Sequence, residues 1–290
     1  MALIGLAFDV LFLGYQPTGR WPVPLAAPVA TLVAGVSAWI GYRNGDRMVL
    51  ASSLARPLRR EDPGAQVLQN VVEEMAIAAG IPAPAVWVID DDDPNAFATG
   101  RAPEHASIAV TRGLLAALSR DELQGVIGHE IAHIRNYDIR TMTIVAALLG
   151  GVVLLSEWGS RLRVRGRDRD EGRAGLASTV VVVLGLVALV VAPLVGRLLA
   201  MAVSRRREYD ADATSAELTR NPLGLAKALR KLETAAAPTR RIARGTAHLC
   251  ITDPLGRRLS SLDGALADLL ATHPPIGKRI ALLEQLAYAR

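Results

Sequence analysis

The stretch Gly128-His129-Glu130-Ile131-Ala132-His133 constrains the fold of this chain most, because its two histidines can work together only on a helix. Residues four apart lie on one helical face, one turn apart, so both imidazoles can bind one metal ion. Zinc suits imidazole, and in hydrolases it usually takes three protein ligands and a water molecule. Glu130 adjoins the first histidine and is placed to act as a general base toward that water. The motif predicts a zinc-dependent peptidase and leaves the third ligand open.

The surrounding sequence predicts a helix at this position, preceded by a small sheet. Ser119 and Glu122 have the spacing of a capping box, which opens a helix expected over Asp121–Tyr137. Apolar spacing and turn residues predict further helices over 65–79, 218–233 (broken at Asn221-Pro222), 259–270 and 276–289, and strands over 85–89, 95–100 and 107–111. The open edge of such a sheet can pair with the backbone of an extended substrate.

Long uncharged segments predict insertion into a membrane. Hydrophobic residues make up 51% of the 290 residues, and they gather in runs. Ala174–Gly196 has no charged residue over 23 positions and Leu25–Tyr42 has none over 18, against the roughly 20 that a spanning helix needs. The shorter runs Ala2–Tyr15, which carries Asp9, and Thr141–Ser156 complete two candidate hairpins. A buried helical hairpin in a soluble protein remains the alternative.

The distribution of arginine predicts the orientation in the membrane. Five arginines lie within residues 43–60, whereas the turn before Leu25 offers only Arg20. The positive-inside rule therefore places the chain after Tyr42 in the cytoplasm. An arginine-rich stretch at 161–173 runs against this bias if both later segments span, so full crossing by residues 141–196 stays open.

The overall charge bears on the class of binding partner, and the cysteine count bears on disulfides and on the type of metal site. The net charge is +5, which suits either nucleic acid or anionic lipid headgroups. Aromatic residues make up only 4% and do not interleave with a basic stripe, so headgroups are favoured and no nucleic-acid partner is expected. The single cysteine, Cys250, excludes an internal disulfide and a cysteine-rich zinc site.

Glu208 is the leading candidate for the third metal ligand. It precedes Asp212 by four residues, so both lie on one helical face. Glu208 can bind the metal while Asp212 accepts the N–H of a ligating histidine and fixes its tautomer. The alternative is a solvated charged face formed with Arg205 and Arg206. His105, His248 and His273 are rival ligands.

His273 and Arg279 are candidates for contact with a substrate. His273 precedes two prolines, which hold its backbone extended. Attack of water on a peptide carbonyl creates an oxyanion, to which His273 could donate a hydrogen bond, and Arg279 could hold the substrate backbone. A turn histidine and a surface arginine remain the alternative.

Together these residues resemble the HtpX heat-shock family of integral-membrane zinc metallopeptidases, relatives of the CaaX prenyl proteases. The resemblance covers nearly the whole chain. It rests on five blocks: Asn95–Gly100, Gly128–His133 continued by Ile134–Asp138, Ser204–Asp212, Thr246–Leu249, and Thr272–Pro275 with Arg279. The first apolar segment departs from the family in being short and carrying Asp9.

The resemblance implies a gluzincin fold and assigns roles to the residues. One zinc ion per chain is expected on His129, His133 and Glu208, with Glu130 as the base and Asp212 behind the ligands. The same resemblance implies substrate contacts by the strand residues Asn95, Ala96 and Phe97 and by His273 and Arg279. Family members degrade misfolded or damaged membrane proteins on the cytoplasmic side of the cell membrane.

The chain is therefore expected to be an α+β protein, a mainly helical integral membrane protein with a gluzincin-type peptidase domain and a small mixed sheet. The expected divisions are a transmembrane hairpin over 1–42, a first peptidase half over 43–138, a second hairpin over 139–196 and a second peptidase half over 197–290. Its expected partners are protein substrates and the lipid bilayer. The alternatives are a processing protease for one substrate and a zinc-containing membrane scaffold, although a scaffold would not need Glu130. The oligomeric state stays open.

Overall fold

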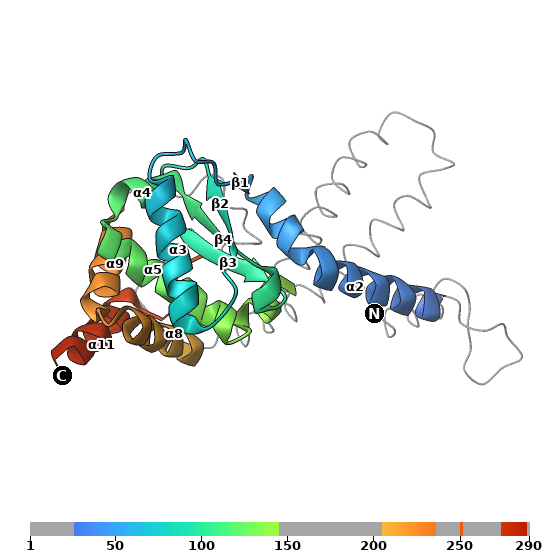
Figure 1. Ribbon diagram of the computed structural model, residues 1–290. Helices are drawn as coiled ribbons and strands as arrows, with labels where there is room; N and C mark the ends of the chain where they lie inside the picture. Colours follow the sequence, from blue (N-terminus) through green and yellow to red (C-terminus); the bar gives the residue numbers. More distant parts are fainter. Residues whose placement is uncertain (1–25, 145–204, 236–249, 252–273, 289–290) are drawn as a thin grey trace, which may run out of the picture.

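The computed structural model describes residues 26–144, 205–235, 250–251 and 274–288 (Figure 1). Its helices are α2 (Ala26–Ser52), α3 (Ala65–Ala79), α4 (Arg112–Ala117), α5 (Arg120–Arg135), α8 (Arg205–Thr219), α9 (Pro222–Thr234) and α11 (Ile276–Tyr288). Residues 138–144 are also helical. The predictions for residues 1–25, for most of 141–196, for 259–270 and for His248 and His273 lie outside the described residues.

Four strands form one mixed sheet in the order β1-β2-β4-β3. The strands are β1 (Arg56–Pro57), β2 (Ala85–Ile89), β3 (Ala96–Gly100) and β4 (Ala106–Thr111), with the short 3₁₀ helix η1 (Pro103–His105) before β4. β2 and β4 run parallel, whereas β1 and β3 pair antiparallel at the two edges. A mainly helical protein with a small mixed sheet is thus confirmed, and β1 is an addition that the sequence did not predict.

Both faces of the sheet are covered by apolar packing. Successive residues of a strand point to opposite faces, and the side chains divide accordingly. One face, including Ile108 and Val110, packs against α3 and α5. The opposite face, including Ile89 and Phe97, packs against Val49 and Leu50 at the end of α2. The sheet therefore lies between the helices of the body and the last turns of α2.

Helix α5 lies between the sheet and the later helices and contacts α3, β3, α8 and α9 (Figure 1). Two glycines of α5 allow this close packing. A Cβ at Gly125 would lie 2.6 Å from the backbone nitrogen of Leu225 on α9, and one at Gly128 would lie 2.9 Å from Ser215 Oγ on α8. Ser215 Oγ also donates a 2.7 Å hydrogen bond to the carbonyl of Gly125. The glycines thus bring α8 directly against the helix that carries the two histidines.

Replacement of Gly125 by alanine tests this packing. The added methyl group meets the backbone of α9 rather than a flexible side chain, so Gly125→Ala should lower the free energy of unfolding by about 1–3 kcal/mol. Gly277→Ala on α11 is the matched control, because nothing lies within 4 Å of the added carbon. That control should be neutral or stabilising by up to about 1 kcal/mol. Equal effects of both variants in denaturant melts would contradict the packing argument.

Helix α2 continues ten residues beyond Tyr42, where the apolar run ends. The prediction placed a charged, non-membrane segment there, but the chain stays helical because Val49 and Leu50 are buried against the sheet. The first part of α2 projects from the body as an arm (Figure 1) and carries exposed apolar side chains, among them Leu32 and Trp39. Among the described residues, no helix combines the length and the apolar composition that crossing a bilayer requires.

Candidate metal centre

Helix α5 carries the candidates His129, Glu130 and His133, and hydrogen bonds stabilise its N-terminus. The capping box is present: Ser119 and Glu122 exchange side-chain and backbone hydrogen bonds at the N-terminus of α5. Lys231 of α9 also donates a 2.7 Å hydrogen bond to Glu122. Three turns further along, His129, Glu130 and His133 are all at most 5% exposed. The predicted helix and its histidine face are confirmed.

Glu208 on α8 completes a cluster with the two histidines. The His129 and His133 Nε2 atoms are 3.2 Å apart, and the Glu208 carboxylate oxygens lie 3.8 Å and 3.5 Å from them. A tetrahedral ion with ligand bonds near 2.0–2.2 Å needs donor atoms roughly 3.3–3.5 Å apart. The three donors therefore fit a single small metal ion. His105, a rival ligand, lies exposed in η1 and takes no part in this cluster.

Asp212 and Arg279 hold His129 from behind. Asp212 Oδ1 lies 2.9 Å from His129 Nδ1, which leaves Nε2 directed at the cluster. Arg279 is fully buried and donates from Nε and Nη2 to the two oxygens of Asp212 at 2.8 Å and 2.7 Å. Burial raises the pKa of Asp212, but the charge and hydrogen bonds of Arg279 outweigh it and leave this pKa below its ordinary value. Asp212 thus favours the anionic form behind His129, and because Glu208 and Asp212 are both buried, these two carboxylates are not part of a solvated charged face.

Asp138 plays the same part for His133, and the sequence reasoning gave it no role. Its Oδ2 lies 3.1 Å from His133 Nδ1, and its Oδ1 lies 3.5 Å from Nε of Arg207 on α8. In a continuous helix, a residue five positions on would lie about 140° around the axis from His133. The helix instead ends at Arg135, and Tyr137 takes a left-handed φ of 61°, which returns the chain toward His133. Helical spacing could not have revealed this contact.

The two histidines differ in their affinity for protons. Burial lowers the pKa of His129, and the nearby positive charge of Arg279 lowers it further, so its imidazole stays neutral. Burial also acts to lower the pKa of His133, but Asp138, Glu208 and Glu130 raise it to about 10. Four buried carboxylates surround the histidines, from Glu130, Asp138, Glu208 and Asp212, against the two guanidinium groups of Arg207 and Arg279. Metal binding requires His133 to release its proton, and the two negative charges that then remain in excess suit a divalent cation.

The residues expected to contact a substrate are buried as the structure places them. Asn95 is fully buried, and its Oδ1 accepts a hydrogen bond from the Ala96 N–H. Phe97 is also fully buried and belongs to the apolar cluster beside α2. Arg279, expected at the surface in one reading, is 0% exposed. Their roles toward a substrate stay predictions. The outer edge of β3 is engaged at Ala96 by the N–H of Ile251 and at Gly100 by Thr143 Oγ1.

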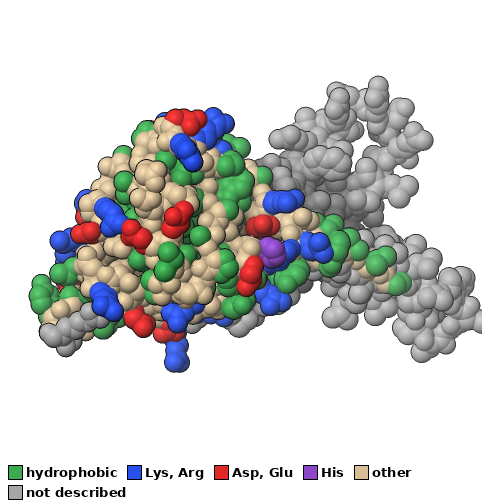
Figure 2. Space-filling model, in the orientation of Figure 1, with side chains coloured by type: hydrophobic (Ala, Val, Ile, Leu, Met, Phe, Trp, Pro, Cys, Tyr) green, Lys and Arg blue, Asp and Glu red, His purple; other side chains and the backbone are tan. Residues whose placement is uncertain are grey.

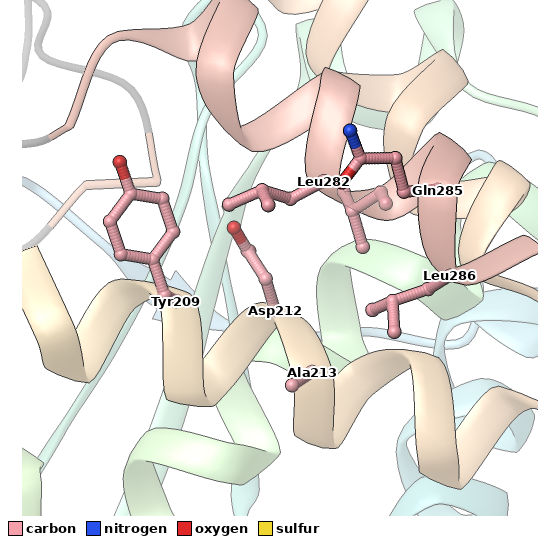
Figure 3. A pocket seen from close by; sticks show the side chains of 7 residues that line it. Tyr209, Asp212, Ala213, Leu282, Gln285 and Leu286 are labelled. Carbon is pink, nitrogen blue, oxygen red and sulfur yellow. The ribbon is translucent and has the colours of Figure 1, made fainter. Parts of the chain in front are cut away.

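A small pocket of about 300 Å³ lies between α8 and α11, beside Asp212 (Figure 3). Tyr209, Asp212 and Ala213 line it from α8, and Leu282 and Leu286 line it from α11. Its lining is mostly apolar. Because Asp212 stands behind His129, this pocket lies behind the candidate ligands rather than on the side of their Nε2 and carboxylate donors.

Removal of the Asp138 carboxylate should weaken metal binding. Asp138→Asn keeps the size of the side chain but removes the charge that orients His133, so metal affinity should fall about 10- to 100-fold. Asp210→Asn on the exposed side of α8 is the matched control and should leave affinity unchanged. Competition with a chromophoric chelator measures both constants. An unaltered affinity in Asp138→Asn would refute the orienting role.

Comparison with known proteins assigns the chain to a family. The sequence model of "Peptidase family M48" matches residues 64–287. A "Protease HtpX homolog" of Thermoanaerobacter pseudethanolicus is 42% identical, over 98% of this chain and 91% of that protein. A "Protease HtpX homolog" of Streptococcus gordonii is 38% identical, over 99% of this chain and 92% of that protein. The crystal structure of S. mikatae Ste24p is similar over 89% of this chain and 64% of that one, with a TM-score of 0.47 and 18% identity.

The match covers the α5 helix with both histidines, the α8 helix with Glu208 and the α11 helix with Arg279. The cluster of possible metal donors and the family assignment therefore concern the same residues. The chain belongs to peptidase family M48 and is a metalloprotease whose substrates are proteins.

Proposed function

We propose that this protein is a membrane-anchored zinc endopeptidase that cleaves misfolded or damaged membrane proteins on the cytoplasmic side. The observation that carries the proposal is the buried cluster of His129, His133 and Glu208, whose donor atoms all lie within 4.8 Å of one another. Glu130 is buried and lies between the two histidines in the sequence of α5, so it is placed to act as the general base. A purely structural metal site would have no use for it.

The donor set favours zinc over other common divalent ions. Two imidazoles and one carboxylate are the ligands of a catalytic zinc site with one position left for water. Magnesium and calcium prefer a shell of oxygen ligands, which this cluster does not offer. A bound zinc ion lowers the pKa of water toward about 7 and polarises a carbonyl group.

The side chains supply the remaining steps of hydrolysis. Glu130 accepts a proton from the attacking water and passes it to the amine that leaves. Asp212 and Asp138 hold the rings of His129 and His133 in the required orientation. His273 and Arg279 are proposed to stabilise the oxyanion and the substrate backbone.

Two features support the membrane location. The uncharged run Ala174–Gly196 has the length of a spanning helix, and the projecting part of α2 carries exposed apolar side chains that suit lipid.

The packing of α5 against α8 restricts how the chain can cross a membrane. These helices pack together although 75 residues separate His133 from Glu208 (208 − 133). The intervening residues must therefore cross a membrane twice or not at all. On the visible face, basic and acidic side chains are interspersed rather than gathered in a basic stripe (Figure 2), which does not favour nucleic acid.

Cleavage of several unrelated substrates tests the proposal. The full chain in detergent or lipid should cleave a panel of unfolded membrane proteins, lose activity with a chelator and regain it with stoichiometric zinc. The folded forms of the same proteins are the control and should resist. Cleavage of a single panel member at a single site would favour the processing protease. Zinc binding without cleavage of any panel member would favour the alternative of a zinc-containing membrane scaffold.

Trapping in native membranes identifies the physiological substrates. Glu130→Gln should keep bound proteins uncleaved, so they can be recovered with the variant and identified. Recovery of mainly soluble proteins would refute the membrane-protein substrate class while leaving the zinc mechanism intact.

A further inference from the structure

The outer edge of β3 is already engaged by the chain itself. β3 is an edge strand, and in an antiparallel pair alternate residues direct their backbone groups away from the partner strand. Ala96 and Gly100 are two such residues. The Ala96 carbonyl accepts a 2.9 Å hydrogen bond from the N–H of Ile251, and the Gly100 N–H donates to Thr143 Oγ1 at 3.0 Å. Residue 251 thus takes the place that an added strand would take.

Residues 250 and 251 also behave like a strand in their side chains. Cys250 joins the apolar cluster that contains Phe97, on the face of the sheet toward α2. Ile251 joins the opposite cluster, which contains residues of α5 and Ile280 of α11. Both are at most 2% exposed. Successive side chains on opposite faces are what a substrate strand would present.

The carbonyl of Ile251 contacts Arg279, the buried arginine beside the metal centre. It accepts a 3.3 Å hydrogen bond from Nη1 of Arg279, and the same nitrogen lies 3.5 Å from Glu208 Oε2. One guanidinium group therefore separates this peptide bond from a proposed metal ligand. An N–H held by an edge strand and a carbonyl held by a cation are the two backbone contacts that a protease needs to align a substrate.

From this geometry we infer that residues 250–251 occupy the substrate position on β3, and that a substrate binds by displacing them. The inference rests on the proposed function and adds a regulation to it: the resting enzyme is closed by its own backbone. Cleavage then requires a polypeptide that competes for Ala96 and Arg279. A folded protein has its backbone already paired and offers no such strand, so it leaves the segment in place.

The exchange selects for apolar substrate segments. Displacement breaks the hydrogen bonds to Ala96 and Arg279 and removes Cys250 and Ile251 from two apolar clusters. A substrate strand restores the backbone bonds whatever its sequence, but only apolar side chains restore the burial. Two successive residues of similar size and apolarity therefore compete well, whereas an aspartate at either position should lower the affinity at least about tenfold, because its charge would be buried.

Cys250 offers a direct measurement, because it is the only cysteine of the chain. The test uses the full-length Glu130→Gln protein with zinc, a maleimide reagent and a cysteine-free, fluorescently labelled unfolded polypeptide. Anisotropy reports binding of the polypeptide, and mass spectrometry reports the rate of thiol labelling. We expect slow labelling at rest and a rise of about tenfold or more at saturating polypeptide, as the buried thiol becomes exposed.

A second cysteine position controls for general loosening. Ala228 is fully buried on α9, which packs against α5, α8 and α11, so Cys250→Ser/Ala228→Cys should label slowly with and without polypeptide. A rise at both positions would overturn the inference, since it would report unfolding. Unchanged labelling of Cys250 while the polypeptide is bound would also overturn it, because residues 250–251 would then be a fixed part of the sheet. Cleavage of the polypeptide by Glu130→Gln would instead overturn the proposed mechanism and leave the labelling result valid.

A variant of the segment itself gives an independent test. Ile251→Pro has no N–H to donate to Ala96. In the protein with Glu130 intact, it should cleave the polypeptide about three- to tenfold faster than the parent chain, because the closed state loses a hydrogen bond. Slower or equal cleavage by a folded Ile251→Pro protein would overturn the inference. If that variant does not fold, the labelling experiment decides, since it leaves residue 251 unchanged. If the polypeptide fails to bind the resting chain and Ile251→Pro does not restore binding, the inference is likewise wrong.

Discussion

Glu130→Gln should bind zinc as tightly as the parent chain and lose nearly all proteolysis. Glutamine has almost the same shape as glutamate but cannot accept a proton, and positioned general bases contribute about 10²–10⁴-fold to rate. The loss in kcat should therefore be at least about 100-fold, with little change in the KM for an unfolded substrate. Metal content by elemental analysis and steady-state cleavage of a fluorogenic polypeptide measure the two properties in one preparation.

Glu217→Gln is the matched control for this result. Glu217 is an exposed carboxylate on α8, the helix that also carries Glu208. Its replacement removes the same charge from the molecule without touching the buried cluster, so cleavage should be unchanged. Full activity in a zinc-loaded Glu130→Gln protein would sink the mechanism. Loss of zinc from that variant would show that Glu130 also shapes the metal site.

Arg279→Met should be among the most destabilising single substitutions in the described part of the chain. Arg279 is fully buried, it is bonded through two nitrogens to Asp212, and it lies 3.5 Å from Glu208. Methionine fills much of the same space but leaves both carboxylates without their cation. Removal of one partner from a buried ion pair costs about 3–5 kcal/mol. Chemical denaturation of the metal-free protein gives the relevant free energy, since a bound metal would mask part of the loss.

Arg230→Met separates the effect of burial from the loss of an arginine. Arg230 on α9 pairs with Glu284 on α11, and about half of its side chain is exposed. An ion pair in contact with solvent contributes little, so its loss should cost under about 1 kcal/mol. Similar costs for the two variants would mean that Arg279 is not the counter-ion of a buried anionic cluster. Arg279→Met should also weaken zinc binding, because Asp212 would no longer hold the ring of His129.

Local patterns predicted most of the elements well. Helix α3 and strand β2 have the bounds expected from apolar spacing, and Gly80 ends α3 in a left-handed conformation. The capping box at Ser119 opens α5 as predicted. Helix α3 and the capping box depend on contacts between residues close in sequence, for which periodicity and capping chemistry are direct indicators. Strand β2 also needs its partners β1 and β4, which are distant in sequence. α2 shows the limit of such patterns, because burial of Val49 and Leu50 extends it past the end of the apolar run.

The sequence by itself determined the two histidines, the carboxylate between them and a candidate for the third ligand. The i, i+4 spacing puts His129 and His133 on one face, and the same spacing links Glu208 to Asp212. These relations follow from the geometry of a single helix, so no tertiary contact is needed to recognise them.

Only the tertiary structure decided how these helices meet. The close approach at Gly125 and Gly128 brings Glu208 to the histidines, and the left-handed turn at Tyr137 brings Asp138 under His133. The structure also buries Arg279 behind Asp212 and lays Ile251 along β3. Each of these contacts joins residues through packing or a change of chain direction. Their strength comes from burial in a low-dielectric interior, which no spacing along the chain encodes.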